Sequence, residues 1–230
     1  IYSENQIVFN FLKFANTFKK TNPLICFAAK SNSNLNILKV LGKLGAGADV
    51  VSGGELLKAL KAGIKPNKIV FSGVGKTEEE LKIAINKKIL LINCESESEA
   101  KLVNNLAKKI RKKVSIGFRL NPNVDAKTHK NISTGKAENK FGLSIKNFKA
   151  FLKTIKSFKN VKLEELSVHI GSQILSETPY RKTMKVISKL ITELKLTLKY
   201  VNLCEGFGIN YTDTEKPINL SNYSRLVHNF

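Results

Sequence analysis

Cysteine and histidine are scarce in this 230-residue chain, which has three of each. The cysteines form no Cys-x-x-Cys pair, and an odd number without a regular framework is typical of proteins from a reducing compartment. The histidines lie too far apart in the sequence for the usual spacing of metal ligands. We therefore expect a cytoplasmic protein with no disulfide framework and no metal site. The residues concerned are Cys26, Cys94, Cys204, His129, His169 and His228.

Long hydrophobic runs are also missing. No apolar stretch approaches the roughly 18 residues that a membrane-spanning helix needs. The N-terminus shows no basic segment followed by a continuous apolar run, as a signal peptide would. No linker rich in proline, glycine or serine and no low-complexity tract divides the chain. The 42% of hydrophobic residues is typical of an ordinary folded domain, and we expect no membrane partner.

Acidic residues are few compared with basic ones. The chain has 18 acidic and 39 basic residues, which gives a formal net charge of +21. Such an excess first suggests a nucleic-acid-binding protein. Only four of the basic residues are arginine, however, and the lysines are scattered along many predicted helices instead of forming one stripe. We favour solvated lysine-rich faces with no nucleic-acid partner, and we keep nucleic-acid binding as an alternative hypothesis.

Seven short runs rich in Ile, Val, Leu and Phe recur along the chain. Several are apolar at consecutive positions, which suits parallel strands that are covered on both faces. The predicted strands are residues 23–30, 47–52, 68–73, 89–96, 114–121, 163–171 and 198–206.

Helical patterns separate these runs and carry readable start signals. The predicted helices include residues 4–19, 34–44 and 55–62 and one that runs from Ser144 toward Ser157. The pairs Thr77/Glu80 and Ser96/Glu99 predict capping boxes, and Thr178 followed by Pro179 predicts an N-cap and a proline at the first helical position. In helix 55–62, we expect an inner face of Leu56, Leu57, Ala59 and Leu60.

The alternation of strands and helices predicts an α/β fold with parallel pairing and right-handed crossovers. An open doubly wound sheet is one reading of this pattern. A (β/α)8 barrel fits the count better, because it has eight strands in about 250 residues. With seven predicted strands, the chain is one strand short of such a barrel.

Polar residues gather where the predicted strands end, which is where barrel enzymes place their chemistry. The candidates are, in strand order, Lys30, Asp49, Arg119, His169, Ser172 and the loop Gly206–Gly208. A lysine desolvated beside an apolar strand would be nucleophilic, although most lysines of this chain are better explained as surface residues. His169 is compatible with a satisfied core histidine or with a site residue.

The stretch GVGKT (73–77) lacks the first glycine of a P-loop, since Val70 stands there, and we reject that motif.

Several longer stretches occur together in the order and spacing of a known family. They are FAAKSNSN (27–34), LGAGADVVSGGEL (44–56), KIVFSGVGKTEEEL (68–81), INCESESE (92–99), RLNPNVDAKTHKNISTG (119–135), KFGLS (140–144) and VHIGSQI (168–174). In these stretches the chain resembles the pyridoxal-phosphate-binding barrel of diaminopimelate decarboxylase, within the class-II ornithine, lysine and arginine decarboxylases of the alanine-racemase-like fold. The similarity covers nearly the whole chain, and HIGSQ and FSGVGKT favour the diaminopimelate subfamily.

The resemblance implies a role for each candidate. Lys30 would bind pyridoxal phosphate covalently, His169 would stack on the ring of the cofactor, and Ser172 with Gly206 and Gly208 would hold the phosphate. Asp49, Glu55 and Arg119 would form a polar shell around the lysine and the ring, and Lys140 would lie near a dimer interface. The catalytic residues would thus be Lys30 and His169.

The implied reaction is the decarboxylation of meso-diaminopimelate, an amino-acid substrate, to lysine and CO2. The implied assembly is a homodimer with active sites shared between its subunits.

The chain departs from the family pattern in three places. Ser31 replaces an alanine after the cofactor lysine, and Cys204 and Glu205 stand where the family has two glycines. The eighth strand and the C-terminal β-domain of the family have no counterpart, so we expect residues 1–230 to form an incomplete barrel domain. The alternative within the same fold is a degenerate barrel that binds pyridoxal phosphate, or an inactive partner, without decarboxylase activity.

Overall fold

The computed structural model describes residues 1–129, 132–136, 141–203, 206–211 and 217–230. The chain forms two compact units. The first contains Ile1–Gly117 and Phe158–Lys162, and the second contains Phe118–Ser157 and Leu163–Phe230.

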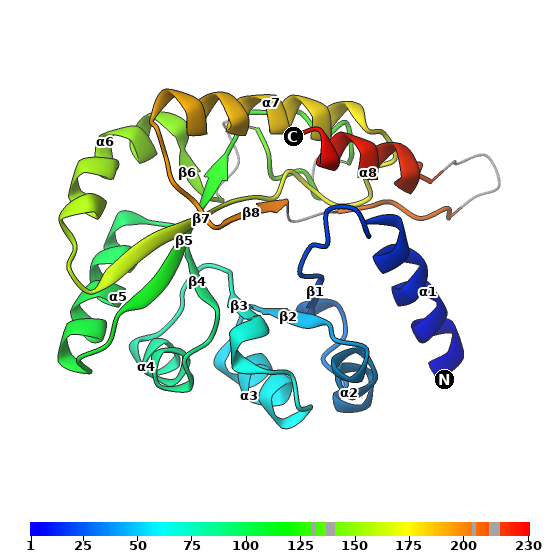
Figure 1. Ribbon diagram of the computed structural model, residues 1–230, viewed down its shortest axis with the longest axis horizontal. Coiled ribbons are helices and arrows are strands. Elements are labelled where there is room, and N and C mark those ends of the chain that lie inside the picture. Colours follow the sequence, from blue (N-terminus) through cyan, green and yellow to red (C-terminus); the bar gives the residue numbers. More distant parts are fainter. Residues whose placement is uncertain (130–131, 137–140, 204–205, 212–216) are drawn as a thin grey trace. The chain divides into compact units, whose positions relative to one another are not determined.

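The first unit alternates strands with helices (Figure 1). Its elements are α1 (Glu4–Thr17), β1 (Cys26–Ala28), α2 (Leu35–Lys43), β2 (Gly47–Val50), α3 (Gly53–Lys61), β3 (Ile69–Phe71), α4 (Glu78–Lys87), β4 (Leu91–Cys94), α5 (Glu97–Lys109) and the start of β5 (Val114–Asn121), with 3-10 turns at Ala29–Ser31 and Pro66–Lys68. Strands β1 to β4 pair in sequence order and in parallel, with Ala28 beside Asp49 and Asp49 beside Val70. Helices α2, α3 and α4 lie along the same side of these strands.

Burial explains why the strand runs of this unit are apolar at consecutive positions. Every residue of β3 and β4 is buried, and in β2 only Asp49 is partly exposed. Strands covered on both faces gain hydrophobic stabilisation from each side chain rather than from every second one. On α1, Ile7 and Phe11 pack against the buried Ile37 and Leu41 of α2.

Side chains cap the helices of the first unit mostly as predicted. Thr77 and Glu80 form a full capping box at α4. At α5, Ser96 Oγ accepts a hydrogen bond from Glu99 N–H (3.1 Å), but the Glu99 carboxylate accepts from Glu95 N–H (2.8 Å). The predicted box at α5 is therefore formed only on its serine side.

The predicted inner face of α3 is wrong at one position. Leu56 and Ala59 are fully buried, whereas Leu57 is 50% exposed. With 3.6 residues per turn, adjacent positions are about 100° apart, so Leu56 and Leu57 do not face the same way.

The second unit contains the end of β5, β6 (Leu143–Ser144), α6 (Ile145–Ser157), most of β7 (Val161–Val168), α7 (Thr178–Glu193), β8 (Tyr200–Leu203) and α8 (Leu220–His228). Strand β6 pairs with β5 in parallel through Leu120 and Leu143, and β8 pairs with β7 in parallel from Glu165/Tyr200 to Val168/Leu203. Helices α6, α7 and α8 lie on one side of these strands (Figure 1). The buried ring of Phe118 on β5 packs against Phe148 and Phe151 of α6, with ring centroids 5.8 and 6.1 Å apart.

One prediction for the second unit is wrong, and two of its elements were not predicted. Thr178 is the first residue of α7 rather than its N-cap, which is Glu177 and makes no capping side-chain bond. Strand β6 was not predicted, because two residues carry no readable periodicity. Helix α8 was not predicted either, although Asn219 Oδ1 accepts from Asn222 N–H (3.1 Å) and is an N-cap visible in the sequence.

The seven predicted strands are all present, and most are shorter than predicted because their ends form turns. The observed parallel pairing with intervening helices confirms the predicted α/β class. None of the helices in the described ranges is long and apolar enough to cross a membrane.

Candidate functional site

Lys30 lies just after β1, in the 3-10 turn Ala29–Ser31. The polar stretch that follows satisfies the backbone of the turn: Ser31 Oγ donates to Ala28 O (2.8 Å), and Asn34 Oδ1 caps α2 by accepting from Asn36 N–H (2.9 Å). These local bonds end the strand and begin the helix within a few residues, and they leave the Lys30 side chain exposed. Within the described part of the chain, Lys30 Nζ has no hydrogen-bond or ion-pair partner. The predicted desolvation of this lysine is therefore not observed.

Asp49 is the partly exposed residue of β2 and lies beside Ala28 of β1 in the parallel register. Because the 3-10 turn of Lys30 starts directly after Ala28 and packs against β2, the same corner of the first unit holds the amine and a carboxylate. This is the only pair of the seven candidate site residues that belongs to the first unit.

Glu55 holds the turn after β2. Its Oε2 accepts a hydrogen bond from Val51 N–H (2.9 Å), and its own N–H donates to the N-cap Ser52 Oγ (3.2 Å). This carboxylate therefore binds the backbone of the turn where α3 begins. Its contribution to the expected polar shell would be to hold that turn in place.

In the second unit, the loop that follows β7 carries His169, Gly171 and Ser172 and is braced by an earlier segment. Thr134 Oγ1 donates to His169 O (2.7 Å), and Thr128 Oγ1 donates to Ser172 O (2.8 Å). Ser172 N–H donates to Ile132 O (3.1 Å). These bonds immobilise the backbone at both ends of the loop, while the His169 side chain stays partly exposed and that of Ser172 exposed.

Gly206 and Gly208 lie against the same loop. A Cβ atom on Gly206 would be 1.9 Å from Gly171 O, and one on Gly208 would be 2.5 Å from Leu175 Cδ2. Ile174 N–H donates to Gly206 O (2.8 Å), and Gly208 N–H donates to Ile174 O (3.0 Å). At Gly206 only glycine permits this close approach of two backbones, which brings Gly206 beside Ser172.

The N–H groups of the glycine loop point to partners inside the protein. Gly206 N–H donates to Tyr180 Oη (3.3 Å), Gly208 N–H to Ile174 O, and Ile209 N–H to Gln173 Oε1 (3.1 Å). Ser172, which lies beside this loop, is exposed and carries a hydroxyl donor. Cys204 and Glu205, the departures from the family pattern, lie outside the described residues, as does Lys140.

Arg119 lies on β5 in the second unit and is partly exposed. Its guanidinium is 4.9 Å from the centroid of the Phe141 ring, a cation–π contact that directs the side chain. The structure thus brings His169, Ser172, Gly206 and Gly208 together on two adjacent loops, with Arg119 on a strand of the same unit. Lys30 and Asp49 form a separate group on the first unit.

Sequence reasoning gave no role to Thr128, Thr134, Gln173 or Tyr180, which support these loops. Thr128 and Thr134 are within the quoted stretch 119–135, and Gln173 is within HIGSQ. Their partners lie 26 to 45 residues away, so local patterns contain no signal for these contacts.

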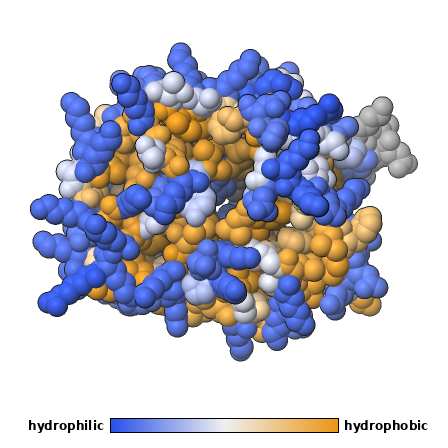
Figure 2. Space-filling model, in the orientation of Figure 1, coloured by the Kyte–Doolittle hydropathy of each residue, from blue (hydrophilic) through white to orange (hydrophobic). Residues whose placement is uncertain are grey.

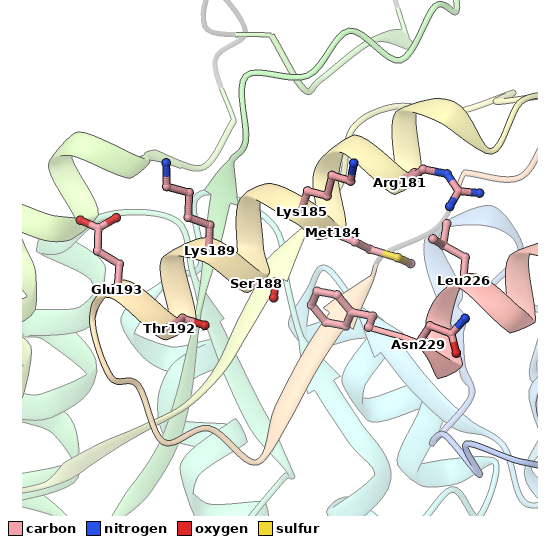
Figure 3. Close-up of a pocket in the computed structure, with 10 residues that line it drawn as sticks. Arg181, Met184, Lys185, Ser188, Lys189, Thr192, Glu193, Leu226 and Asn229 are labelled. Carbon is pink, nitrogen blue, oxygen red and sulfur yellow. The ribbon is translucent and has the colours of Figure 1, made fainter.

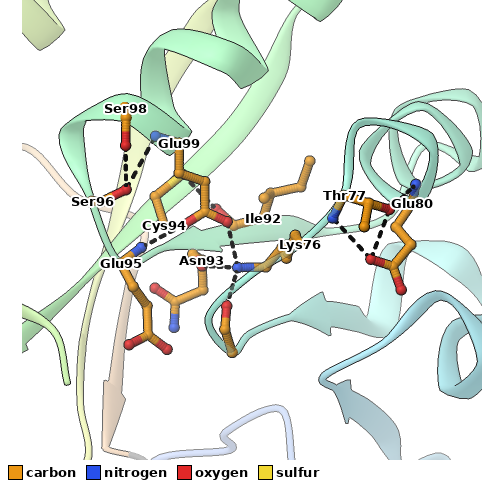
Figure 4. Close-up of polar contacts among 11 residues, drawn as sticks. Lys76, Thr77, Glu80, Ile92, Asn93, Cys94, Glu95, Ser96, Ser98 and Glu99 are labelled. Carbon is orange, nitrogen blue, oxygen red and sulfur yellow. Dashed lines mark hydrogen bonds and ion pairs between the residues drawn. The ribbon is translucent and has the colours of Figure 1, made fainter. Parts of the chain in front are cut away.

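Lys76, of the rejected P-loop stretch, is turned into the first unit (Figure 4). Its Nζ donates to Gly73 O (2.6 Å), Asn93 O (2.8 Å) and Glu99 Oε1 (2.7 Å), and its side chain has no exposed surface. All three donor positions of the ammonium group are therefore used within the protein, which agrees with a structural role.

A pocket of about 670 Å³ lies in the second unit between α7 and α8 (Figure 3). It is lined by apolar side chains of Met184, Leu226 and Phe230 and by Arg181, Lys185 and Lys189 along α7, among others. None of the candidate site residues lines this pocket.

The candidate residues fit pyridoxal phosphate by the chemistry of their groups. The cofactor needs an accessible primary amine for its aldehyde, and Lys30 offers one. It needs a hydrogen-bond donor at the phosphate, which the exposed Ser172 hydroxyl offers. A carboxylate, a guanidinium and an imidazole complete a polar set suited to a charged heterocycle.

Comparison with known proteins matches these features to one family. The model of the family described as pyridoxal-dependent decarboxylase, pyridoxal binding domain, matches residues 4–230. A diaminopimelate decarboxylase of Aquifex aeolicus is 42% identical over 219 residues, which are 94% of this chain and 52% of the relative. One of Campylobacter jejuni is 42% identical over 230 residues, which are 99% of this chain and 57% of the relative.

The crystal structure of diaminopimelate decarboxylase from Helicobacter pylori complexed with L-lysine is similar throughout, with a TM-score of 0.94 and 40% identity. The match covers 99% of this chain and 58% of that chain. The likeness confirms the predicted fold class, a parallel α/β barrel domain of the pyridoxal-phosphate type. The chain spans a little more than half the length of the relatives that it matches.

Proposed function

Because the chain belongs to the pyridoxal-dependent decarboxylases, whose pyridoxal-binding domain matches residues 4–230, we propose that it binds pyridoxal phosphate at Lys30. We further propose that it takes part in the decarboxylation of meso-diaminopimelate to lysine and CO2. The observation that carries the proposal is the exposed Lys30 amine in the turn after β1, within a chain about 42% identical to diaminopimelate decarboxylases. The L-lysine in the related crystal structure supports the same reaction, since lysine is diaminopimelate without one carboxyl group.

The proposed roles follow from the chemistry of each side chain. Lys30 Nζ must lose a proton before it can act as a nucleophile, because only the neutral amine has a lone pair. His169 would lie against the cofactor ring, and Asp49 and Arg119 would orient charged groups around it. Ser172 Oγ would donate a hydrogen bond to the phosphate, and Gly206 and Gly208 would let their loop lie close beside Ser172. Bound pyridoxal phosphate supplies an electron sink for the electron pair left when CO2 departs.

The first test concerns Lys30. The chain is incubated with pyridoxal phosphate, reduced with borohydride and mapped by peptide mass spectrometry. We expect the pyridoxyl group on Lys30 at cofactor concentrations that leave Lys39, on the exposed face of α2, unlabelled. Dominant labelling of another lysine, with Lys30 unmodified, would refute the assignment.

The second test concerns the reaction. Residues 1–230 are assayed for lysine and CO2 from meso-diaminopimelate, alone and joined to the C-terminal part of the Helicobacter pylori relative that lies beyond the matched region. We expect turnover in the joined protein and none in its Lys30→Ala variant. Binding of pyridoxal phosphate without turnover in the joined protein would favour the degenerate barrel.

We propose a cytoplasmic enzyme of lysine biosynthesis that acts as a homodimer. Analytical ultracentrifugation of the joined protein would measure its mass, and a monomer that turns over the substrate would contradict the dimer.

A further inference from the structure

The side chain of Gln173 holds the end of the glycine loop. Its Oε1 accepts a hydrogen bond from Ile209 N–H (3.1 Å), and its Nε2 donates to Ile209 O. Both backbone groups of one residue are thus bound by both polar atoms of one amide, across 36 positions of sequence. Two hydrogen bonds between one amide and one residue restrain both the position and the orientation of the Ile209 backbone, whereas a single hydrogen bond leaves its orientation free.

Backbone bonds join the same two segments beside this contact. Ile174 and Phe207 form a parallel bridge, in which Ile174 N–H donates to Gly206 O and Ile174 O accepts from Gly208 N–H. Gln173 therefore extends the pairing of the two loops by one residue beyond the backbone ladder. Ser172, the exposed donor proposed for the phosphate, directly precedes Gln173.

Buried aromatic rings support the glycine loop from within the second unit. The Phe207 ring lies 5.5 Å from Tyr180 and 4.9 Å from Tyr223, and Tyr180 Oη accepts from Gly206 N–H (3.3 Å). Tyr180 and Tyr223 are 4% and 0% exposed. The glycine loop is therefore fixed on its inner side, and Gln173 is the side chain that fixes its far end.

The backbone of Gln173 has a left-handed conformation, with φ at 55°. Residues other than glycine, asparagine and aspartate seldom adopt it, and it persists where the surrounding structure determines it. This conformation accompanies the turn of the chain between Ser172 and Ile174, where Ser172 is directed outward and Ile174 is buried.

We infer that Gln173 is a positioning residue for the phosphate of the cofactor. It holds the Gly206–Ile209 backbone against the Ser172 loop, so that the Ser172 hydroxyl and the glycine backbone stay at a fixed separation. The inference rests on the proposed function, because the ligand is the phosphate of pyridoxal phosphate. It predicts that loss of the Gln173 side chain weakens recognition of the phosphate and leaves recognition of the pyridine ring and aldehyde unchanged.

The test compares pyridoxal phosphate with pyridoxal, which has the same ring and aldehyde but no phosphate. Affinities of the wild type, Gln173→Ala and Gln173→Gly are measured by absorbance titration, with Lys30→Ala as the background for labelling of other lysines. We expect both Gln173 variants to bind pyridoxal phosphate about tenfold more weakly, as the loss of two hydrogen bonds implies, and to bind pyridoxal as the wild type does. Gln173→Gly is included because glycine accepts the left-handed backbone freely, so a shared effect comes from the side chain.

The matched control is Gln6→Ala, which truncates the other glutamine of the chain. Its side chain donates to Asn10 Oδ1 on the exposed surface of α1. In this variant, the ratio of the affinity for pyridoxal phosphate to the affinity for pyridoxal should stay at the wild-type value. The inference would be overturned if Gln173→Ala and Gln173→Gly kept the wild-type ratio, either because neither affinity changes or because both fall by the same factor. A wild type that binds neither compound above the Lys30→Ala background would overturn the proposed function, and this inference with it.

Discussion

Lys76 shows what a single buried charge does in this protein. Its ammonium group, without exposed surface, joins the turn after β3 to the end of β4 and to Glu99 of α5, whose side chain is 11% exposed. The contact also orders the neighbouring turn, because the second oxygen of Glu99 accepts from Glu95 N–H. One residue thus links two successive strand–helix junctions of the first unit.

Replacing Lys76 by methionine should therefore be costly. The variant leaves the Glu99 carboxylate and two backbone carbonyls without their donor, and we expect a loss of about 3 kcal/mol in the free energy of unfolding, as for other broken buried ion pairs. The matched control is Lys82→Met, because Lys82 pairs with Glu78 and Glu79 while 37% exposed and should lose much less stability than Lys76→Met. Denaturant unfolding of both variants checks this, and similar losses would show that Lys76 contributes no more than a surface pair.

At the scale of elements, Glu80 connects two helices. Its Oε1 accepts from Gly53 N–H at the start of α3 (2.6 Å), and its Oε2 accepts from Thr77 N–H (2.9 Å) in the capping box of α4. The hydrogen bond from Gly53 N–H, and then that from Thr77, lowers the pKa of this carboxyl. The charged form is favoured because both helix N-termini present unpaired N–H groups to it.

The lowered pKa predicts a pH dependence with a definite sign. A carboxyl whose pKa is lower in the folded than in the unfolded state contributes stability above its unfolded pKa, and the contribution disappears as the pH falls through the folded pKa. We expect Glu80→Gln to lose about 1 kcal/mol at pH 7, since the site is partly exposed, and the difference from the wild type to shrink as the pH falls below about 4.

The comparison variant is Glu97→Gln, which changes an acidic residue in the first turn of α5 that accepts no hydrogen bond within the described part of the chain. Its effect should be smaller than that of Glu80→Gln at pH 7. Urea unfolding at pH 7 and near pH 3.5 measures both variants, and a loss in Glu80→Gln that is constant with pH would contradict the assignment.

At the scale of the whole molecule, the 39 basic residues behind the charge of +21 are scattered along the sequence rather than gathered in one run. In the face shown in Figure 2, hydrophilic side chains lie in many separate places, with apolar areas between them. Scattered lysines attract polyanions through counterion release, without a surface that reads a sequence.

We therefore expect weak binding to duplex DNA that has no sequence preference and is lost between about 50 and 200 mM salt. Fluorescence anisotropy with two unrelated duplexes checks this expectation, and an excess of DNA should leave the labelling of Lys30 by pyridoxal phosphate unchanged. Tight binding to one duplex at about 200 mM salt would support the nucleic-acid alternative.

The sequence by itself determined the alternation of strands and helices in this protein and the place of seven of its strands. Consecutive apolar residues predicted β3 and β4, and Thr77 with Glu80 predicted the cap of α4, because these signals depend on residues within one turn or one strand. Local pattern also placed Lys30 and His169 at the ends of predicted strands, and both lie directly after or close after the observed ones.

Only the tertiary structure decided which of these residues meet. Gln173 binds Ile209, 36 residues away, and Lys76 binds Glu99, 23 residues away, and no periodicity connects such pairs. Whether a lysine on a strand–helix turn is buried or exposed was likewise undecided: Lys76 is enclosed, and Lys30 is exposed. The physical reason is that short-range patterns set the conformation of the backbone, whereas burial and long-range hydrogen bonds depend on how strands and loops far apart in the sequence pack together.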